Sequence, residues 1–213
     1  MTQRGAPRVA YETPRLIVRP WRDHPDDLAR ILDIYSRAEV CRWLGNPAPP
    51  PGRDAAPPTD RPAASGVREP SSGPAYPLTD LAHAARRQRE WAERNAAAPY
   101  PCGIWAVERR DTGVAVGTVL LKVLPRSDGT VGEDIEVGWH LHPDSWGHGY
   151  ATEAARGALD RAFAAGVPQV FAVLFPDNAA SAAVTRRLGM TPLGLTDRWY
   201  GEELASFVLR RPA

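Results

Sequence analysis

The amino-acid sequence predicts an α/β (α+β) fold, and three observations carry this expectation. Segments with the apolar spacing of helices are interleaved with segments rich in β-branched and aromatic residues. Apolar residues make up 43% of the 213 residues, which is enough for a substantial core. Residues 146–152 form a short glycine-containing stretch between an expected strand and an expected helix. Together these patterns predict about six to seven strands and about four helices.

The N-terminal part of the chain predicts one strand and two helices. Residues 16–19 (LIVR) have the composition of a short strand. Residues 26–37 have helical apolar spacing, and Asp26 or Asp27 is expected at the helix N-terminus. A second helix is expected at 80–97, where apolar residues recur along one side.

Between these two helices lies a segment of different composition. Residues 47–77 contain 10 of the 22 prolines and show no helical or strand periodicity. Such a segment has little apolar surface to bury. We expect a Pro-rich insertion at about 46–79, and the pattern favours a disordered segment over a lid that covers a substrate site.

The C-terminal part predicts a run of strands with two intervening helices. A continuous apolar run predicts a strand at 170–175 that is buried on both faces. The other expected strands are 104–108, 115–123, 135–141, 191–200 and 204–210. The expected helices are about 150–165, ended by Gly166 and Pro168, and 178–188, ended by Gly189.

Composition excludes several classes of function. The 26 basic and 25 acidic residues almost cancel, which argues against a dedicated binder of nucleic acid or membrane surface. Two cysteines, Cys41 and Cys102, do not form a disulfide framework and fit a reducing compartment. The N-terminus lacks a secretory apolar core, and no apolar run is long enough to span a bilayer. A cytoplasmic protein is therefore expected.

The stretch 146–152 (WGHGYAT) predicts a phosphate-binding site. The first amides of a helix have no partners inside it, and the helix dipole favours negative charge there. Gly147 and Gly149 would let a ligand approach bare backbone. Tyr150 after the second glycine excludes a Walker-type loop, and Gln169 stands where a dinucleotide site needs an acidic residue. The alternative is that the two glycines only make a tight turn.

Four parts of the chain carry recognisable motifs. They are 13–20 (TPRLIVRP), 136–143 (EVGWHLHP) with 146–154 (WGHGYATEA), 178–181 (NAAS) and 187–190 (RLGM). Together these segments, which span most of residues 13–191, resemble the GNAT superfamily of acyl-CoA-dependent N-acetyltransferases. Within it they resemble the RimJ/RimL-like branch, named for ribosomal-protein N-terminal acetyltransferases.

This resemblance implies a mixed central sheet with a splayed parallel pair of strands, 135–141 and 170–175, in one domain of residues 10–213. Acetyl-CoA, as cosubstrate, would lie in the gap between these strands, with its pyrophosphate on the loop amides. The residues implied in cofactor binding are Leu141, Trp146, Gly147, His148, Gly149, Tyr150, Ala151, Thr152 and Asn178. For Asn178 the alternative role is a helix cap.

An amine must lose a proton before it attacks a thioester, so the reaction needs a base. Strand alternation places Glu136, Gly138 and His140 on one face, and Glu136 is our first choice for that base. It could instead be a structural pairing residue, and then Asp134 or His140 would be the candidates. Two hydroxyl groups could stabilise the leaving thiolate, and they belong to Ser181 and Tyr200.

His140, His142 and His148 invite a metal-site interpretation, but no further ligands occur at suitable spacing, so no metal is expected. The expected reaction is acetyl transfer to a primary amine of a peptide or protein N-terminus or of a small molecule. A non-catalytic acyl-CoA-binding regulatory module is the alternative, and another nucleotide-binding α/β protein is a weaker one. The expected partners are acetyl-CoA and an amine acceptor, without nucleic acid or membrane, for a monomer or homodimer.

Overall fold

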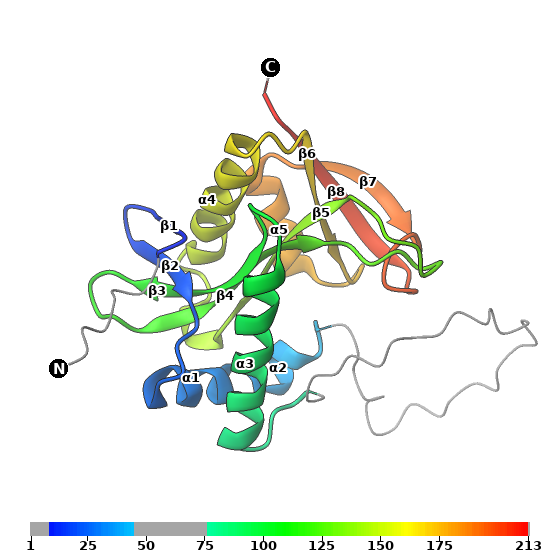
Figure 1. Cartoon of the computed structure of the whole chain (residues 1–213). Helices are drawn as coiled ribbons and strands as arrows, with labels where there is room; N and C mark the ends of the chain where they lie inside the picture. The colour runs from blue at the N-terminus through cyan, green and yellow to red at the C-terminus, as the bar shows by residue number, and fades with distance from the viewer. Residues whose placement is uncertain (1–8, 45–75, 213) are drawn as a thin grey trace, which may run out of the picture.

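The computed structural model describes residues 9–44 and 76–212, which fold around one open sheet of eight strands (Figure 1). The larger part of the expected Pro-rich insertion, 46–75, lies outside the described residues. The strand order is β1-β2-β3-β4-β5-β6-β8-β7. The strands are β1 (Tyr11–Glu12), β2 (Leu16–Pro20), β3 (Gly103–Arg109), β4 (Ala115–Val123), β5 (Ile135–Leu141), β6 (Gln169–Leu174), β7 (Thr191–Thr196) and β8 (Leu204–Arg210).

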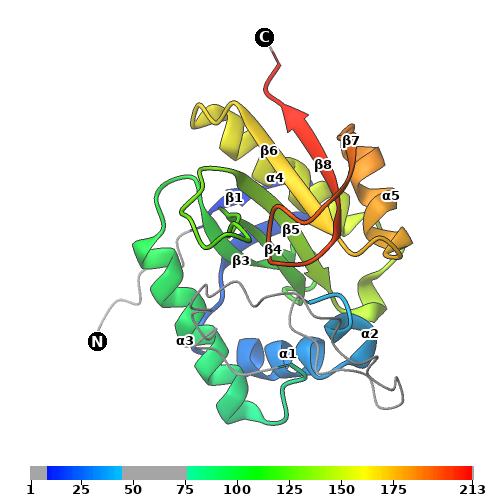
Figure 2. The same cartoon turned by 90° about the vertical axis from the view of Figure 1, so that its right-hand side faces the viewer.

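Helices cover both faces of this sheet (Figures 1 and 2). They are α1 (Pro25–Tyr35), α2 (Ala38–Cys41), α3 (Leu81–Ala97), α4 (Tyr150–Ala164) and α5 (Ala179–Leu188), with a 3-10 turn, η1, at Pro143–Ser145. The α4 and α5 helices lie on one face, and α1, α2 and α3 lie toward the other. The mixed α/β architecture expected from the sequence is therefore confirmed.

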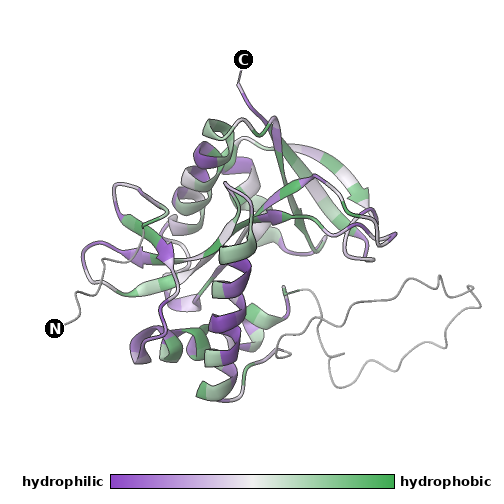
Figure 3. Ribbon diagram, viewed as in Figure 1, coloured by the Kyte–Doolittle hydropathy of each residue, from purple (hydrophilic) through white to green (hydrophobic). Residues whose placement is uncertain are grey.

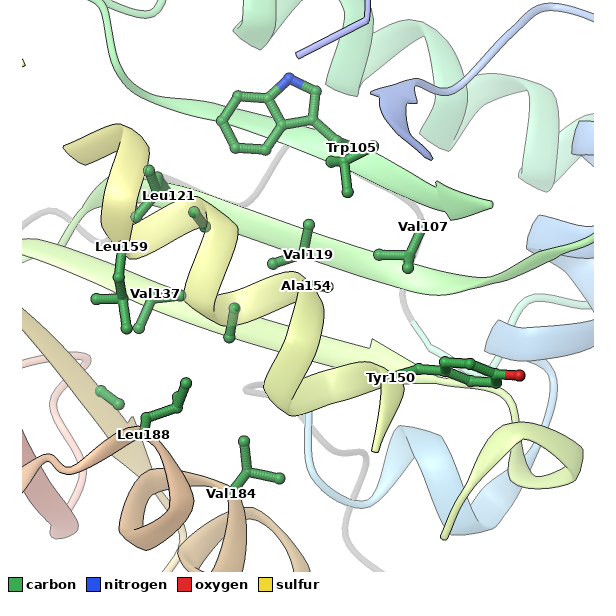
Figure 4. Packing of buried hydrophobic residues seen from close by; sticks show 14 of the residues in the cluster. Trp105, Val107, Val119, Leu121, Val137, Tyr150, Ala154, Leu159, Val184 and Leu188 are labelled. Atoms are coloured by element: carbon green, nitrogen blue, oxygen red, sulfur yellow. The ribbon is translucent and has the colours of Figure 1, made fainter. Parts of the chain in front are cut away.

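The core between α4 and the sheet forms because α4 presents a stripe of small residues. Ala154, Ala155, Ala158 and Ala162 are fully buried, so the helix approaches the strands closely. Figure 4 shows Val119, Leu121 and Val137 of the sheet under this helix, with Val184 and Leu188 of α5 beside it. In Figure 3, α3 is largely hydrophilic, in keeping with a helix that covers the sheet with one side only.

Several boundaries differ from the sequence expectation. Neither β1 nor α2 was expected, because segments of two and four residues are too short to show periodicity. The α1 helix begins at Pro25 with His24 as its N-cap, instead of Asp26 or Asp27. Asp27 does not cap the helix; it is buried and accepts hydrogen bonds from Arg19. The β7 strand ends at Thr196, before the turn that contains Tyr200.

Two neighbouring parallel strands separate along their length, and this shapes the site. The β5 and β6 strands pair only at Ile135 with Val170 and at Glu136 with Phe171. Beyond these pairs β5 remains bonded to β4 and β6 remains bonded to β8. The expected splayed pair is thus confirmed. Burial on both faces of β6 is also confirmed, since Val170 and Ala172 face one core cluster and Phe171 faces another.

No helix within 9–44 and 76–212 is long and apolar enough to cross a bilayer.

Candidate functional site

The loop between β5 and α4 presents unpaired amides. Gly149 is the N-cap of α4 with φ 78°, and Gly147 has φ 80°, so both adopt the left-handed conformation that favours glycine. No side chain caps α4. Among the hydrogen bonds within the described residues, none is donated by the main-chain amides of 147–152. Unpaired amides and the dipole of a 15-residue helix favour an anion at this N-terminus.

The segment before β2 braces this loop from behind. Arg15 Nη1 donates a 3.0 Å hydrogen bond to the carbonyl oxygen of His148. Glu153, in the first turn of α4, accepts from the main-chain N–H of Arg15 at 2.9 Å and from Thr13 Oγ1 at 2.7 Å. These contacts hold the loop through the carbonyl oxygen of His148 and through the first turn of α4, and they leave the loop amides free. The segment Thr13-Pro14-Arg15, the first of the segments that resemble the family, therefore supports the glycine loop.

The other residues expected to contact the cofactor have distinct surroundings. Trp146 Nε1 donates to the carbonyl oxygen of Leu141 at 2.9 Å, which ties the loop to the end of β5. Tyr150 packs its ring in the core and against the ring of His148, and its amide lies at the N-terminus of the helix. The Ala151 side chain packs against the same core, and Thr152 Oγ1 is buried without a hydrogen-bond partner. The loop thus presents main-chain groups, more than polar side chains, to a ligand.

The gap between β5 and β6 opens toward this loop. Past Glu136 and Phe171 the two strands no longer pair with each other, so their facing edges retain unpaired main-chain groups. An extended ligand with amide groups can bond to such an edge. The β5–α4 loop follows the C-terminal end of β5, so its amides lie at the end of the strand where the gap is open.

Glu136 lies where the gap begins and is buried, with 6% of its surface exposed. Tyr200 donates a short hydrogen bond from its hydroxyl to Glu136 Oε1. Lys122 Nζ lies 3.2 Å from the same oxygen. Burial and the adjacent carboxylate raise the pKa of Tyr200 well above its ordinary value, so its proton stays on the phenol. Tyr200 also has φ 63°, a strained value for a tyrosine.

The sequence identified Glu136 and Tyr200 separately but missed Lys122. Lys122 stands opposite Glu136 in the antiparallel β4–β5 register, and a sequence alone does not reveal that register. The fallback base Asp134 accepts hydrogen bonds from Arg198 at 2.8 Å and from Trp199 Nε1 at 3.3 Å. Both contacts anchor the segment that leads to Tyr200.

Asn178 and Ser181 lie at the start of α5. Asn178 is buried, and its side-chain oxygen accepts a 3.0 Å hydrogen bond from the main-chain N–H of Ser181. The helix-cap role considered for Asn178 is therefore observed. Its NH₂ group donates no hydrogen bond among the described residues. Ser181 is half-buried in the first turn of the helix.

We expect Asn178→Ala to lower the free energy of unfolding by about 1 kcal/mol, because the capping oxygen is lost. Asn178→Asp keeps that oxygen and should stay close to the wild type. Urea denaturation of the three proteins checks this. Equal stability of Asn178→Ala and wild type would show that the cap contributes nothing.

The three histidines considered as metal ligands point to different partners. The strand ends at Leu141, so His142 lies outside it as the N-cap of η1 and does not share a strand face with His140. His142 Nε2 lies 3.1 Å from Asp33, and the His148 ring stacks on Tyr150. No cluster of three potential metal ligands occurs within the part of the chain that the structure describes.

Comparison with known proteins agrees with this geometry. The model of the acetyltransferase (GNAT) domain family matches residues 15–191. "Uncharacterized N-acetyltransferase YoaA" of Bacillus subtilis (strain 168) is 30% identical over 92 residues. That match covers 43% of this chain and 50% of YoaA, so the chain spans about half the length of that relative.

Two solved structures illustrate the shared fold. An acetyltransferase (GNAT family) from Bacillus anthracis superposes with TM-score 0.64 and 16% identity, covering 94% of this chain and 97% of that one. RimL, a ribosomal L7/L12 α-N-protein acetyltransferase in complex with coenzyme A, also gives TM-score 0.64, at 12% identity, covering 95% of this chain and 97% of its own. With most of its length matched by the family model, this chain belongs to the GNAT acetyltransferase family.

Proposed function

We propose that this chain transfers an acetyl group from acetyl-CoA to a primary amine of a peptide or protein N-terminus or of a small molecule, using a single domain of residues 10–213. Acetyl transfer from acetyl-CoA is the activity of the family. The observation that carries the finer proposal is the buried Glu136 carboxylate at the narrow end of a gap whose wide end presents free amides.

In this proposal the cofactor is held mainly by backbone. The amides of Gly147 to Ala151 receive the pyrophosphate, and the facing edges of β5 and β6 pair with the pantetheine amides. Asn178 can donate from its free NH₂ group to a carbonyl of the same arm. This arrangement directs the thioester toward the narrow end of the gap, where Glu136 lies.

The acceptor arrives as an ammonium ion at neutral pH and cannot attack until it loses a proton. Glu136 takes that proton, while Tyr200 and Lys122 hold the carboxylate in place. The neutral amine then forms the C–N bond, and the C–S bond breaks with its electron pair on sulfur. The hydroxyl of Ser181 is the group we assign to stabilise the thiolate.

The same contacts also favour one second candidate. Tyr200 and Lys122 both bind Oε1 of Glu136, which is the arrangement of a structural pairing residue. A non-catalytic acyl-CoA-binding module would keep the glycine loop and use Glu136 only in this way.

Incubation with acetyl-CoA and a panel of amines distinguishes the two candidates. The panel contains peptides with free N-termini, polyamines, amino acids and aminoglycosides, and the readout is release of free thiol. An enzyme should release thiol at a rate that depends on the acceptor. Tight binding of acetyl-CoA without turnover for every amine would favour the regulatory module.

A further inference from the structure

A chain of hydrogen-bonded side chains ends at His140, on the face of β5 opposite α4. Trp21 Nε1 donates to Thr118 Oγ1 at 3.1 Å, and the Tyr35 hydroxyl donates to the same oxygen at 2.7 Å. Tyr35 Oη and His140 Nδ1 are 3.3 Å apart. Trp21, Tyr35 and Thr118 are all buried. Three side chains, from the segment after β2, from α1 and from β4, therefore support the orientation of one imidazole.

These contacts support the assignment of the ring proton to Nδ1. With the Tyr35 proton directed at Thr118, the phenol oxygen is free to accept from Nδ1–H of His140, and this is the tautomer that we adopt. A neutral imidazole protonated at Nδ1 has its lone pair on Nε2. Within the described residues Nε2 has no hydrogen-bond partner, and it is not one of the buried unpaired atoms. The half-buried ring thus presents a nitrogen with a free lone pair.

His140 and Glu136 stand on the same face of β5, two residues to either side of Gly138. Gly138 has no side chain, and the side chain of Leu120 on β4 lies 3.1 Å from the position that a Cβ atom would take. The stretch of β5 between the two side chains is also the stretch that no longer pairs with β6. A thioester held in the gap would therefore lie between a carboxylate and an imidazole.

The proposed reaction requires two proton transfers from the acceptor nitrogen. An ammonium ion loses one proton before it attacks, and the nitrogen loses a second when the tetrahedral intermediate becomes an amide. The thiolate takes up one of these protons, and the other passes to solvent. Glu136 holds only one proton at a time, and its Oε1 is already bound by Tyr200 and Lys122. A base other than Glu136 can accept the second proton and pass it on to the thiolate or to solvent.

We propose that His140 is a second catalytic residue of this transfer, with Nε2 accepting the proton that the nitrogen loses as the C–S bond breaks. This proposal rests on the proposed function. The N–H electron pair stays on nitrogen, the C–S pair goes to sulfur, and the proton passes from Nε2 to the thiolate or to solvent. Tyr35, Thr118 and Trp21 are positioning residues, because they act only through the imidazole.

The environment of His140 keeps this nitrogen available. Burial, assisted by the charge of Lys122 on β4, lowers the pKa of His140 to about 4. Tyr35 on α1 stays protonated because burial raises its pKa well above the ordinary value. Glu136 on the same strand is bound by its own partners. The imidazole is therefore neutral at pH 5 to 8, and we expect no rate inflection from it near its ordinary pKa of about 6.5.

Two acceptors separate the roles of Glu136 and His140. One acceptor is an ammonium ion at the assay pH, and the other is a weakly basic amine that is already neutral. Glu136→Gln should regain most of its rate with the neutral amine, because the first proton is absent. His140→Asn and His140→Gln lack an Nε2 base and should stay about 100-fold below wild type in kcat with both acceptors. Their KM for acetyl-CoA should be unchanged.

Tyr35→Phe serves as the positioning control, since it removes only the hydroxyl group that orients the ring. We expect about a tenfold fall in kcat with both acceptors and no change in the KM for acetyl-CoA. Wild-type kcat in both His140 variants, or a deficit that disappears with the neutral amine, would overturn the assignment. Absence of thiol release from the wild type would instead refute the proposed function.

Discussion

Replacing Glu136 by Gln should lower kcat for an ammonium acceptor by about 10²- to 10³-fold, since removal of a general base has an effect of this size. The amide has nearly the shape of the carboxylate and can still accept a hydrogen bond from Tyr200. The affinity for acetyl-CoA should be unchanged, because the glycine loop and the wide end of the gap lie away from Glu136. Steady-state rates of thiol release and calorimetry with CoA measure the two quantities.

Lys122→Gln and Tyr200→Phe test whether Glu136 has only a structural role. Each removes one contact to Glu136 Oε1 and leaves the carboxylate present. If Glu136 is the base, these variants should retain far more activity than Glu136→Gln at comparable thermal stability. A structural pairing residue predicts a different order, in which activity follows the melting temperature across all three variants. Glu136→Gln with wild-type kcat would exclude this residue as the base.

Much of the fold follows from local sequence patterns. The strand at 135–141, the glycine loop and the helix that follows have their own periodicity and capping signals, and the structure places them as expected. Tyr11 shows why β1 escaped detection. This strand has two residues, and it is held by Tyr11, whose hydroxyl donates to Ala154 O at 2.6 Å and whose ring lies against Gly157. Such a contact, between residues far apart in the sequence, leaves no periodic signal.

The same distinction applies to the candidate site. Gly147, Gly149 and Glu136 can be recognised because a motif or strand alternation marks them. The partners of these residues come from elsewhere in the chain, as Lys122 does through the β4–β5 register. The Tyr35–Thr118 contact likewise joins residues 83 positions apart, and the Tyr35–His140 contact joins residues 105 positions apart. Sequence analysis thus named candidate residues, whereas their contacts with residues distant in the sequence depend on how the elements pack.

Replacing both Gly147 and Gly149 by Val should weaken CoA binding by about 100-fold. Each valine would have to adopt a left-handed φ near 80°, which costs about 1–2 kcal/mol per residue. The loop would leave this conformation, and its amides would no longer converge on one anion. Two such penalties, together about 3 kcal/mol, correspond to roughly a hundredfold change in Kd. Calorimetric titration with CoA measures the effect.

The double variant Gly113→Val/Gly166→Val is the control for the effect of backbone strain alone. These glycines have φ 69° and 87°, and an added Cβ would meet no atom within 4 Å at either position, as at Gly147. Gly113 lies in the β3–β4 turn and Gly166 follows α4, so neither belongs to the loop. The control should lose stability by a similar amount and keep its affinity for CoA. Because only the loop variant changes the direction of the amides at the N-terminus of α4, unchanged Kd in that variant would mean that these amides do not hold the cofactor.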